Sequence, residues 1–498
     1  MQNHSDRDVK TEAPRGRLLR VLGVGFGLAV IVGNTIGAGI LRTPGEVAAY
    51  LPDVWLYLGV WVACGLYALL GAVSIAELAT MMPRSGGQYV FARRALGPYA
   101  GLVVGWSDWL STTGTAAAVS LVIGEYAGEL VGPLAGRKVE VACAVVLFFA
   151  LLQWRGVRWG GGAQNLTSLL KTLAFAALIV ACFAAGGGGE FASATADATG
   201  ASASEVPRGA SLVSAFALAL LAVSYTYDGW TGVIYFSEEV RDPARDIPRA
   251  LFGGVLLIVV IYLLVNLAFL YVLPLSRVAG ETLAAGAAAR EVFGARGDTV
   301  IRALAAVSLL SSINAYHLMA TRVLFAISRD RLFARAATRV NEGGTPTVAL
   351  LLSTLMALVF VVYGESFVRV ISALAFFFIV NYALSFISLF VLRRREPHAP
   401  RPYRAWGYPV TTALSLAGSV AILAGAIFSD LVSGTDGSLY AVFLLALSLP
   451  AFLLTRLVAR GGEGEGDDNN SNSNDDDDNF NDGGGGDGAE AAGRPSGA

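Results

Sequence analysis

The sequence has few of the residues on which enzymes and disulfide-stabilised proteins depend. Its 498 residues include three cysteines and three histidines, and only 15% are charged. Cys64, Cys143 and Cys182 all lie in apolar stretches, so we expect small buried side chains and neither disulfides nor a metal site. No nucleophile–base set, metal-ligand cluster or phosphate-binding loop stands out. We therefore expect no enzymatic activity, no cofactor and no nucleic-acid partner.

A cleavable signal peptide is also missing, because the first twenty residues are polar and basic and the apolar run behind them is too long. Apolar residues make up 55% of the chain, and the mean hydropathy is +0.59. These values predict an all-α polytopic membrane protein with about twelve transmembrane helices. The expected helices begin near residues 18, 54, 99, 138, 164, 209, 250, 298, 347, 367, 409 and 439.

Basic residues, almost all of them arginine as in many GC-rich bacterial proteins, are unevenly distributed between the loops. The N-terminal tail and the loops after even-numbered helices hold roughly 22 Lys and Arg against about 6 on the other side, a strong positive-inside bias. The sequence therefore predicts a plasma (inner) membrane protein with both termini in the cytoplasm.

Glycines interrupt the first apolar segment in the stretch Gly33-Asn34-Thr35-Ile36-Gly37-Ala38-Gly39. Glycine weakens a helix and lets the backbone leave helical dihedral angles. Exposed backbone is tolerated inside a membrane only where it lines a cavity or is buried in protein. Two half-helices meeting here would offer N–H groups to an anion and carbonyls to a cation. Close helix packing through small residues is the alternative interpretation.

A second interruption lies in the sixth expected helix, at Ser224-Tyr225-Thr226-Tyr227-Asp228-Gly229-Trp230-Thr231-Gly232. An ionisable residue such as Asp228 in the middle of a span indicates a functional site. Helices 1 and 6 are corresponding positions if the core is two five-helix halves, and such pairs indicate a substrate site between inverted repeats. Alternatively, Asp228 only caps a half-helix.

Four motifs in this order resemble those of amino acid–polyamine–organocation (APC) permeases, with the closest likeness to L-type amino acid transporters and their bacterial relatives. They are the glycine-rich helix 1, Pro83-Arg84-Ser85-Gly86-Gly87, the helix 6 Tyr-Asp-Gly-Trp with the charged run 237–250, and Arg401-Pro402-Tyr403-Arg404-Ala405-Trp406-Gly407-Tyr408-Pro409.

The resemblance implies a LeuT-like fold in which helices 1–5 and 6–10 form a 5+5 inverted repeat, with helices 1 and 6 broken. We expect a transport core at 18–396, peripheral helices 11 and 12 at 397–460, and a cytoplasmic N-terminal tail at 1–17. Residues 461–498 carry eleven acidic residues and one arginine among glycine and asparagine. Such a composition predicts a disordered tail.

The same resemblance implies a substrate-binding site. Its residues would be Thr35, Ile36, Gly37, Ala38, Gly39, Tyr225, Asp228, Gly229, Trp230 and Thr231. The amides of Ala38 and Gly39 would meet the substrate carboxylate, with Gly37 permitting the approach. Carbonyls at Thr35, Tyr225 and Asp228 would meet the amino group. Tyr225 would cover the substrate as a gate, and Trp230 and Thr231 would border its side chain. Many relatives have serine where this chain has Ala38, so a hydroxyl contact is missing.

Lys171, in the fifth expected helix, matches a lysine of sodium-independent family members. Its ammonium would take the place of a sodium ion between helices 1 and 8, and it could exchange a proton during the cycle. Ser311 and Ser312, with Asn314, would supply oxygens to this coupling site, or serve only as interhelical hydrogen bonds. The alternative for Lys171 is that its side chain snorkels to the interface.

Charges of alternating sign follow helix 6. Glu238 and Glu239 are expected to close a cytoplasmic gate with Arg84 or Arg329, although a plain solvated loop fits the pattern equally well.

The function that the sequence favours is secondary active transport of neutral L-amino acids across the membrane by alternating access, as a sodium-independent exchanger or a proton symporter. Transport of cationic amino acids or polyamines is the alternative, followed by a non-transporting nutrient receptor. The loop from Glu125 to Arg137 contains no cysteine. We therefore expect a single chain, without the disulfide-linked ancillary subunit of the animal L-type proteins.

Overall fold

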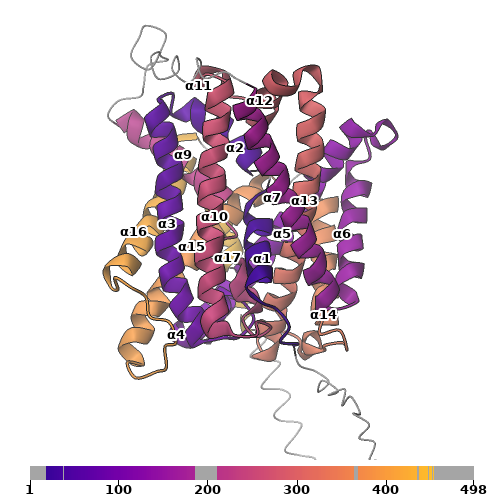
Figure 1. Cartoon of the computed structure of the whole chain (residues 1–498). Coiled ribbons are helices and arrows are strands. Elements are labelled where there is room, and N and C mark those ends of the chain that lie inside the picture. Colours follow the sequence, from indigo (N-terminus) through magenta and orange to yellow (C-terminus); the bar gives the residue numbers. More distant parts are fainter. Residues whose placement is uncertain are drawn as a thin grey trace, which may run out of the picture.

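Long helices running between the two ends of the molecule dominate the structure (Figure 1). The computed structural model describes residues 18–37, 39–185, 210–363, 368–433, 437–446, 448–450 and 452–453. Within these residues the regular secondary structure is helical, apart from two isolated β-bridges that join Leu22 to Val240 and Val340 to Pro346. The predicted all-α architecture is confirmed. The expected tails, 1–17 and 461–498, lie outside the described residues.

The longer helices, in chain order, are α1 (Val24–Thr35), α2 (Gly39–Tyr50), α3 (Val54–Met81), α5 (Pro98–Leu130), α6 (Lys138–Trp154), α7 (Val157–Ala184), α9 (Ala210–Tyr227), α10 (Pro243–Val272), α13 (Gly297–Arg329), α14 (Thr347–Val362), α15 (Val368–Arg395), α16 (Val410–Ser433) and α17 (Gly437–Ala446). The shorter elements are α4 (Gln88–Leu96), α11 (Leu275–Val278), α12 (Ala284–Phe293), and the 3-10 helices η1 (Gly132–Leu134), η2 (Gly232–Phe236), η3 (Gly294–Arg296) and η4 (Arg335–Thr338).

Seven of the described helices are long and apolar enough to cross a membrane, and the bent pair α1 and α2, at 46° to one another, makes an eighth. Large apolar side chains are exposed on the outside of the bundle, for example Leu151 on α6, Leu166 and Leu173 on α7, and Leu414 on α16. An exposed apolar belt of this kind suits contact with lipid. The chain is thus a multi-pass membrane protein, and the count of twelve spans stays a prediction.

The two ends of the bundle are named here after their short helices. The α4 end carries α4, and the α12 end carries α12, at the bottom and top of Figure 1. The first described residues lie at the α4 end, where the Leu22 amide donates to the Glu239 carbonyl at 3.0 Å. At the same end, the rings of Tyr99 and Phe452 are 5.3 Å apart. Both ends of the described chain therefore lie on one side, as expected for two termini in one compartment. Which compartment that is stays a prediction.

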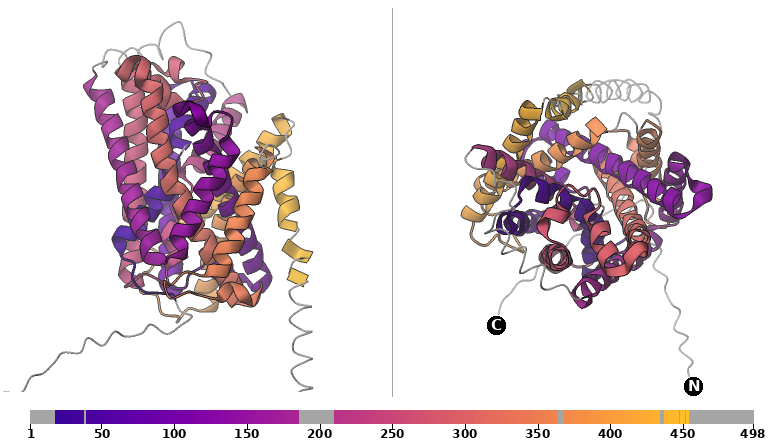
Figure 2. Two further views of the ribbon diagram at one scale, coloured as in Figure 1. Left: turned by 90° about the vertical axis from the view of Figure 1, so that its right-hand side faces the viewer. Right: turned by 90° about the horizontal axis from the view of Figure 1, so that it is seen from above.

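Helix α1 lies inside the bundle and packs against α7, α10, α13 and η2. Viewed from above, the other helices surround α1 and α2, and α16 and α17 lie at the outside (Figure 2). Small residues allow this close approach: a Cβ on Gly27 would lie 2.6 Å from the Cβ of Ala250 on α10. This arrangement does not test whether the helices form two inverted repeats, which stays a prediction.

The motif before α16 has a structural role at the α4 end. Glu77, near the end of α3, is fully buried. It accepts hydrogen bonds from Arg393 at 2.6 Å, from Arg401 at 3.0 Å and from the Ala405 amide at 2.7 Å. These charge-assisted bonds fasten the connection between α15 and α16 to α3.

Candidate functional site at the two helix breaks

The two interrupted helices meet in the middle of the bundle. Helix α1 ends at Thr35 and α2 begins at Gly39, whereas α9 ends at Tyr227 and η2 begins at Gly232. The Asn34 side-chain amide donates to the Gly229 carbonyl at 3.3 Å and joins the breaks. Gly229 has φ +101°, and a Cβ there would lie 2.5 Å from the Asn34 amide nitrogen. Glycine is therefore required at this position.

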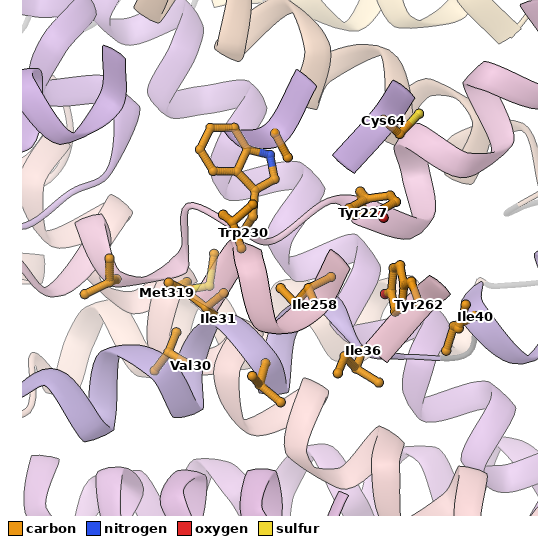
Figure 3. Close-up of a cluster of buried hydrophobic side chains, with 14 of the residues drawn as sticks. Val30, Ile31, Ile36, Ile40, Cys64, Tyr227, Trp230, Ile258, Tyr262 and Met319 are labelled. Atoms are coloured by element: carbon orange, nitrogen blue, oxygen red, sulfur yellow. The ribbon is translucent and has the colours of Figure 1, made fainter. Parts of the chain in front are cut away.

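Tyr262 on α10 holds both breaks from one side, as Figure 3 shows for its ring beside Ile36 and Tyr227. Its hydroxyl lies 2.8 Å from the carbonyl oxygens of both Thr35 and Thr226. A buried carbonyl released from a helix needs such a partner. Tyr262 was not predicted from the sequence, because a tyrosine in an apolar span gives no signal until its partners are known.

A cavity of about 70 Å³ lies against the breaks. The described residues that line it come from α1, α2, α5, α9, α13 and α15. They are Asn34, Thr35, Gly37, Gly39, Thr115, Val119, Tyr225, Thr226, Asp228, Ser312, Tyr316 and Phe378. Of the expected substrate-binding residues, Thr35, Gly37, Gly39, Tyr225 and Asp228 are in this lining. Ile36, Gly229, Trp230 and Thr231 are close by in the chain but are not part of it, and Ala38 lies outside the described residues.

Trp230 is a packing residue in this conformation. Its ring stacks on Tyr382 of α15, with the centroids 5.1 Å apart, and a Cβ on Gly71 would come within 2.9 Å of it. The Tyr382 hydroxyl in turn donates to the Asp228 carboxylate at 2.6 Å. Asp228 thus lines the cavity with a tyrosine as its partner. Trp230 is not among the lining residues, and its expected place beside the substrate side chain stays a prediction.

A further buried carboxylate, Asp108 on α5, was not identified from the sequence. Only 1% of its surface is exposed. One oxygen accepts from the Tyr235 hydroxyl at 2.9 Å, and the other has no partner among the described residues. The signal was present: an acidic residue inside a long span is the criterion that singled out Asp228.

Lys171 is fully buried and reaches the break in helix α1 from α7. Its ammonium donates to the carbonyls of Gly33 at 2.8 Å and Ile36 at 2.5 Å, and lies 3.1 Å from the Ser312 hydroxyl of α13. The side chain therefore does not snorkel to an interface. It supplies N–H donors to carbonyl oxygens that the broken helix leaves without amide partners.

The two serines expected beside Lys171 have different surroundings. Ser312 contacts the ammonium, whereas Ser311 lies 2.9 Å from the Ser168 hydroxyl and 3.2 Å from the Gln164 side-chain amide. Ser308, one turn before Ser312, donates to the Ile36 carbonyl at 3.2 Å. Ser311 therefore belongs to the packing between α1, α7 and α13, and Ser308, which the sequence analysis omitted, belongs to the break.

Gly33 lies where α1 packs against α7 and α13. A Cβ there would lie 1.9 Å from the Gln164 amide nitrogen and 2.7 Å from the hydroxyls of Ser168 and Ser311. We expect Gly33→Ala to lower the free energy of unfolding by about 1–3 kcal/mol, as overpacking does, and to reduce uptake at least tenfold. Thermal unfolding in detergent and uptake into proteoliposomes measure the two effects. Gly25→Ala is the matched control, because a Cβ at Gly25 has nothing within 4 Å. Equal behaviour of the two variants would contradict this account.

The charged residues after the second break make two ion pairs at the α4 end. Glu238 pairs with Arg329 at 2.7 Å, and Glu239 pairs with Arg322 at 2.9 Å with both side chains fully buried. The expected partner Arg84 instead lies 3.8 Å from Asp330. The solvated-loop alternative is therefore wrong for Glu239.

At the α12 end, Tyr126 of α5 lies between two arginines. Arg42 of α2 donates to its hydroxyl at 3.3 Å. The guanidinium of Arg302, which pairs with Glu129, lies 5.8 Å from the ring centroid. Contacts made by charged side chains thus join helices at the α4 end and at the α12 end, on either side of the cavity.

Comparison with known proteins identifies the family. A family model described as "Amino acid permease" matches residues 26–449. The chain belongs to the amino acid permease family. As a permease of the APC superfamily it is a transporter and not an enzyme. Among its relatives, the serine/threonine exchanger SteT of Bacillus subtilis is 30% identical over 424 residues, which cover 84% of this permease and 93% of SteT.

Animal relatives are similar over most of the permease as well. The b(0,+)-type amino acid transporter 1 of Mus musculus is 28% identical over 405 residues, covering 79% of this permease and 80% of the relative. The Asc-type amino acid transporter 1 of Mus musculus is 28% identical over 398 residues, covering 78% and 73%. The resemblance stated from the sequence motifs is confirmed.

Proposed function

We propose that this permease exchanges small neutral L-amino acids across the plasma membrane, independently of sodium. The observation that carries the proposal is the cavity at the two breaks. It combines the N-terminal end of α2, the backbone carbonyl groups of the breaks at Thr35 and Tyr225, and hydroxyl side chains in its wall. A helix N-terminus suits a carboxylate, and carbonyl oxygens suit an ammonium group.

The size of the cavity supports a small substrate. About 70 Å³ is far less than the roughly 300–1,000 Å³ of pockets for drug-sized ligands. The name of the relative SteT, a serine/threonine exchanger, points in the same direction. Cationic amino acids and polyamines are less suited, because they are longer than a cavity of this volume accommodates.

In the proposed binding mode the amides at Ala38 and Gly39 hold the carboxylate, and carbonyls at Thr35, Tyr225 and Asp228 receive the ammonium group. Tyr225 forms the gate over the substrate. Lys171 stands where a sodium ion would bind, which supports sodium independence. Alternating access then opens the α4 end by separating Glu238 from Arg329 and the α12 end by separating Arg42 from Tyr126.

The proposal extends to the arrangement in the membrane. Ten helices form two inverted halves of five, each with its first helix broken, and α16 and α17 are peripheral. The α4 end faces the cytoplasm, because its loops carry the excess of arginine. The loop from Glu125 to Arg137 lacks cysteine, which supports function without a disulfide-linked subunit.

Uptake into proteoliposomes tests the function. We expect labelled serine to enter vesicles preloaded with serine or threonine, and not empty vesicles, whether or not sodium is present. Uptake into empty vesicles driven by an inward proton gradient would show that the mechanism is proton symport and not exchange. Uptake of arginine or putrescine instead of serine would overturn the substrate class. Binding of serine without its transport would indicate a nutrient receptor.

A further inference from the structure

Three buried oxygen atoms in the cavity wall have no hydrogen-bond partner in the described structure. They are Asn34 Oδ1, Thr35 Oγ1 and Thr115 Oγ1, and all three residues line the cavity. Buried polar atoms in proteins almost always have a partner. Three of them around one cavity indicate that a polar ligand supplies the partners.

Thr115 differs from the other hydroxyl residues of α5. The hydroxyls of Ser111, Thr112, Thr113 and Ser120 donate to backbone carbonyls three or four residues earlier in the helix. This is the common way for a helix to satisfy a buried hydroxyl. Thr115 is only 2% exposed and does not make such a bond. Its hydroxyl is therefore free to bind a ligand in the cavity.

The position of Thr115 indicates which part of a ligand it meets. Asn34 and Thr35 belong to the break of α1, where the charged groups of an amino acid would bind. Thr115 belongs to α5, which contributes a different wall together with Val119, one turn further on. When the carboxylate and ammonium groups of an amino acid occupy the breaks, its side chain faces the remaining walls of the cavity.

We propose that the Thr115 hydroxyl binds the side-chain hydroxyl of the substrate, so that this permease selects serine and threonine over alanine. This inference rests on the proposed function and adds the residue that determines specificity. A substrate without a hydroxyl displaces water from the cavity and leaves Thr115 buried without a partner. A site built to bind a hydroxyl discriminates against such an analogue.

Competition in the exchange assay tests the proposal. Labelled alanine is the tracer in preloaded proteoliposomes of the full chain, and unlabelled serine, threonine and alanine compete with it. We expect Thr115→Val, which keeps the shape and removes the hydroxyl, to raise the half-inhibitory concentration of serine roughly tenfold, the worth of one buried hydrogen bond. The value for alanine should change less than twofold. Thr115→Ser should retain the preference for serine.

Thr113→Val is the matched control, because Thr113 is equally buried on the same helix but donates to the Trp109 carbonyl at 2.8 Å. It should leave the serine-to-alanine ratio unchanged. Equal losses for serine and alanine in Thr115→Val, or an unchanged ratio, would overturn the assignment of Thr115 while amino acid exchange stands. Failure of the wild-type protein to exchange any amino acid would refute the proposed function itself.

Discussion

Replacing Lys171 with methionine is expected to reduce amino acid exchange by about 100-fold or more. The substitution keeps an unbranched side chain one atom shorter but removes the ammonium that bonds the carbonyls of Gly33 and Ile36. Hydrogen bonds to a charged group contribute about 1.5–3 kcal/mol each, and buried acceptors left without a donor add a similar penalty. The break in α1 therefore loses the geometry that the substrate needs. Initial rates of exchange in proteoliposomes measure the effect.

Lys138→Met is the matched control for charge and residue type. Lys138 is exposed at the start of α6, so its replacement should leave exchange near the wild-type rate. Thermal unfolding of both variants in detergent shows how much of any loss comes from misfolding. Exchange by Lys171→Met at half the wild-type rate or better would contradict a role for the ammonium at the break.

The second large effect is expected at the fully buried pair of Glu239 and Arg322. Glu239→Gln leaves the guanidinium buried without a countercharge. Breaking such a pair from one side lowers the free energy of unfolding by about 3–5 kcal/mol, whereas replacing both partners costs less. We therefore expect Glu239→Gln to unfold at a clearly lower temperature, and the double variant with Arg322→Met to recover part of the loss.

An exposed pair in the same chain provides the comparison. Arg277 and Glu291 are 56% and 41% exposed, and pairs of this kind contribute about 0–1 kcal/mol. Glu291→Gln should therefore shift the unfolding temperature very little. If Glu239→Gln and Glu291→Gln destabilise to the same extent, the pair with Arg322 does not hold this end of the bundle together.

The sequence predicted the breaks better than the contacts that stabilise them. Gly33, Gly37 and Gly229 were informative because glycine in the middle of a span has a local meaning that needs no partner. Asp228 was informative because an acidic residue in lipid is costly wherever its partner lies. The all-helical architecture followed from hydropathy for the same reason, since the length of an apolar run is a local property.

Contacts between distant residues were not predictable in this way. Tyr262 reaches Thr35 across 227 positions of the sequence, and Tyr382 reaches Asp228 across 154. No sequence pattern distinguishes these two tyrosines from the other tyrosines of the chain. Trp230 was expected at the cavity from the family resemblance, but the turn after Gly229 directs its ring onto Tyr382. Side-chain direction in an irregular segment depends on backbone angles that composition does not specify.

In its proposed role as a substitute for a sodium ion, Lys171 would change the thermodynamics of the site, because its positive charge is covalently attached to the protein. A bound metal ion occupies its site according to its concentration on the side that is open, and its release on the other side drives the cycle by mass action. A tethered ammonium has the same local concentration whichever side is open. As long as it keeps its proton, it cannot couple the cycle to an ion gradient. In the proposed exchange cycle, with Lys171 protonated throughout, the direction of net movement then depends on the concentrations of the transported molecules alone.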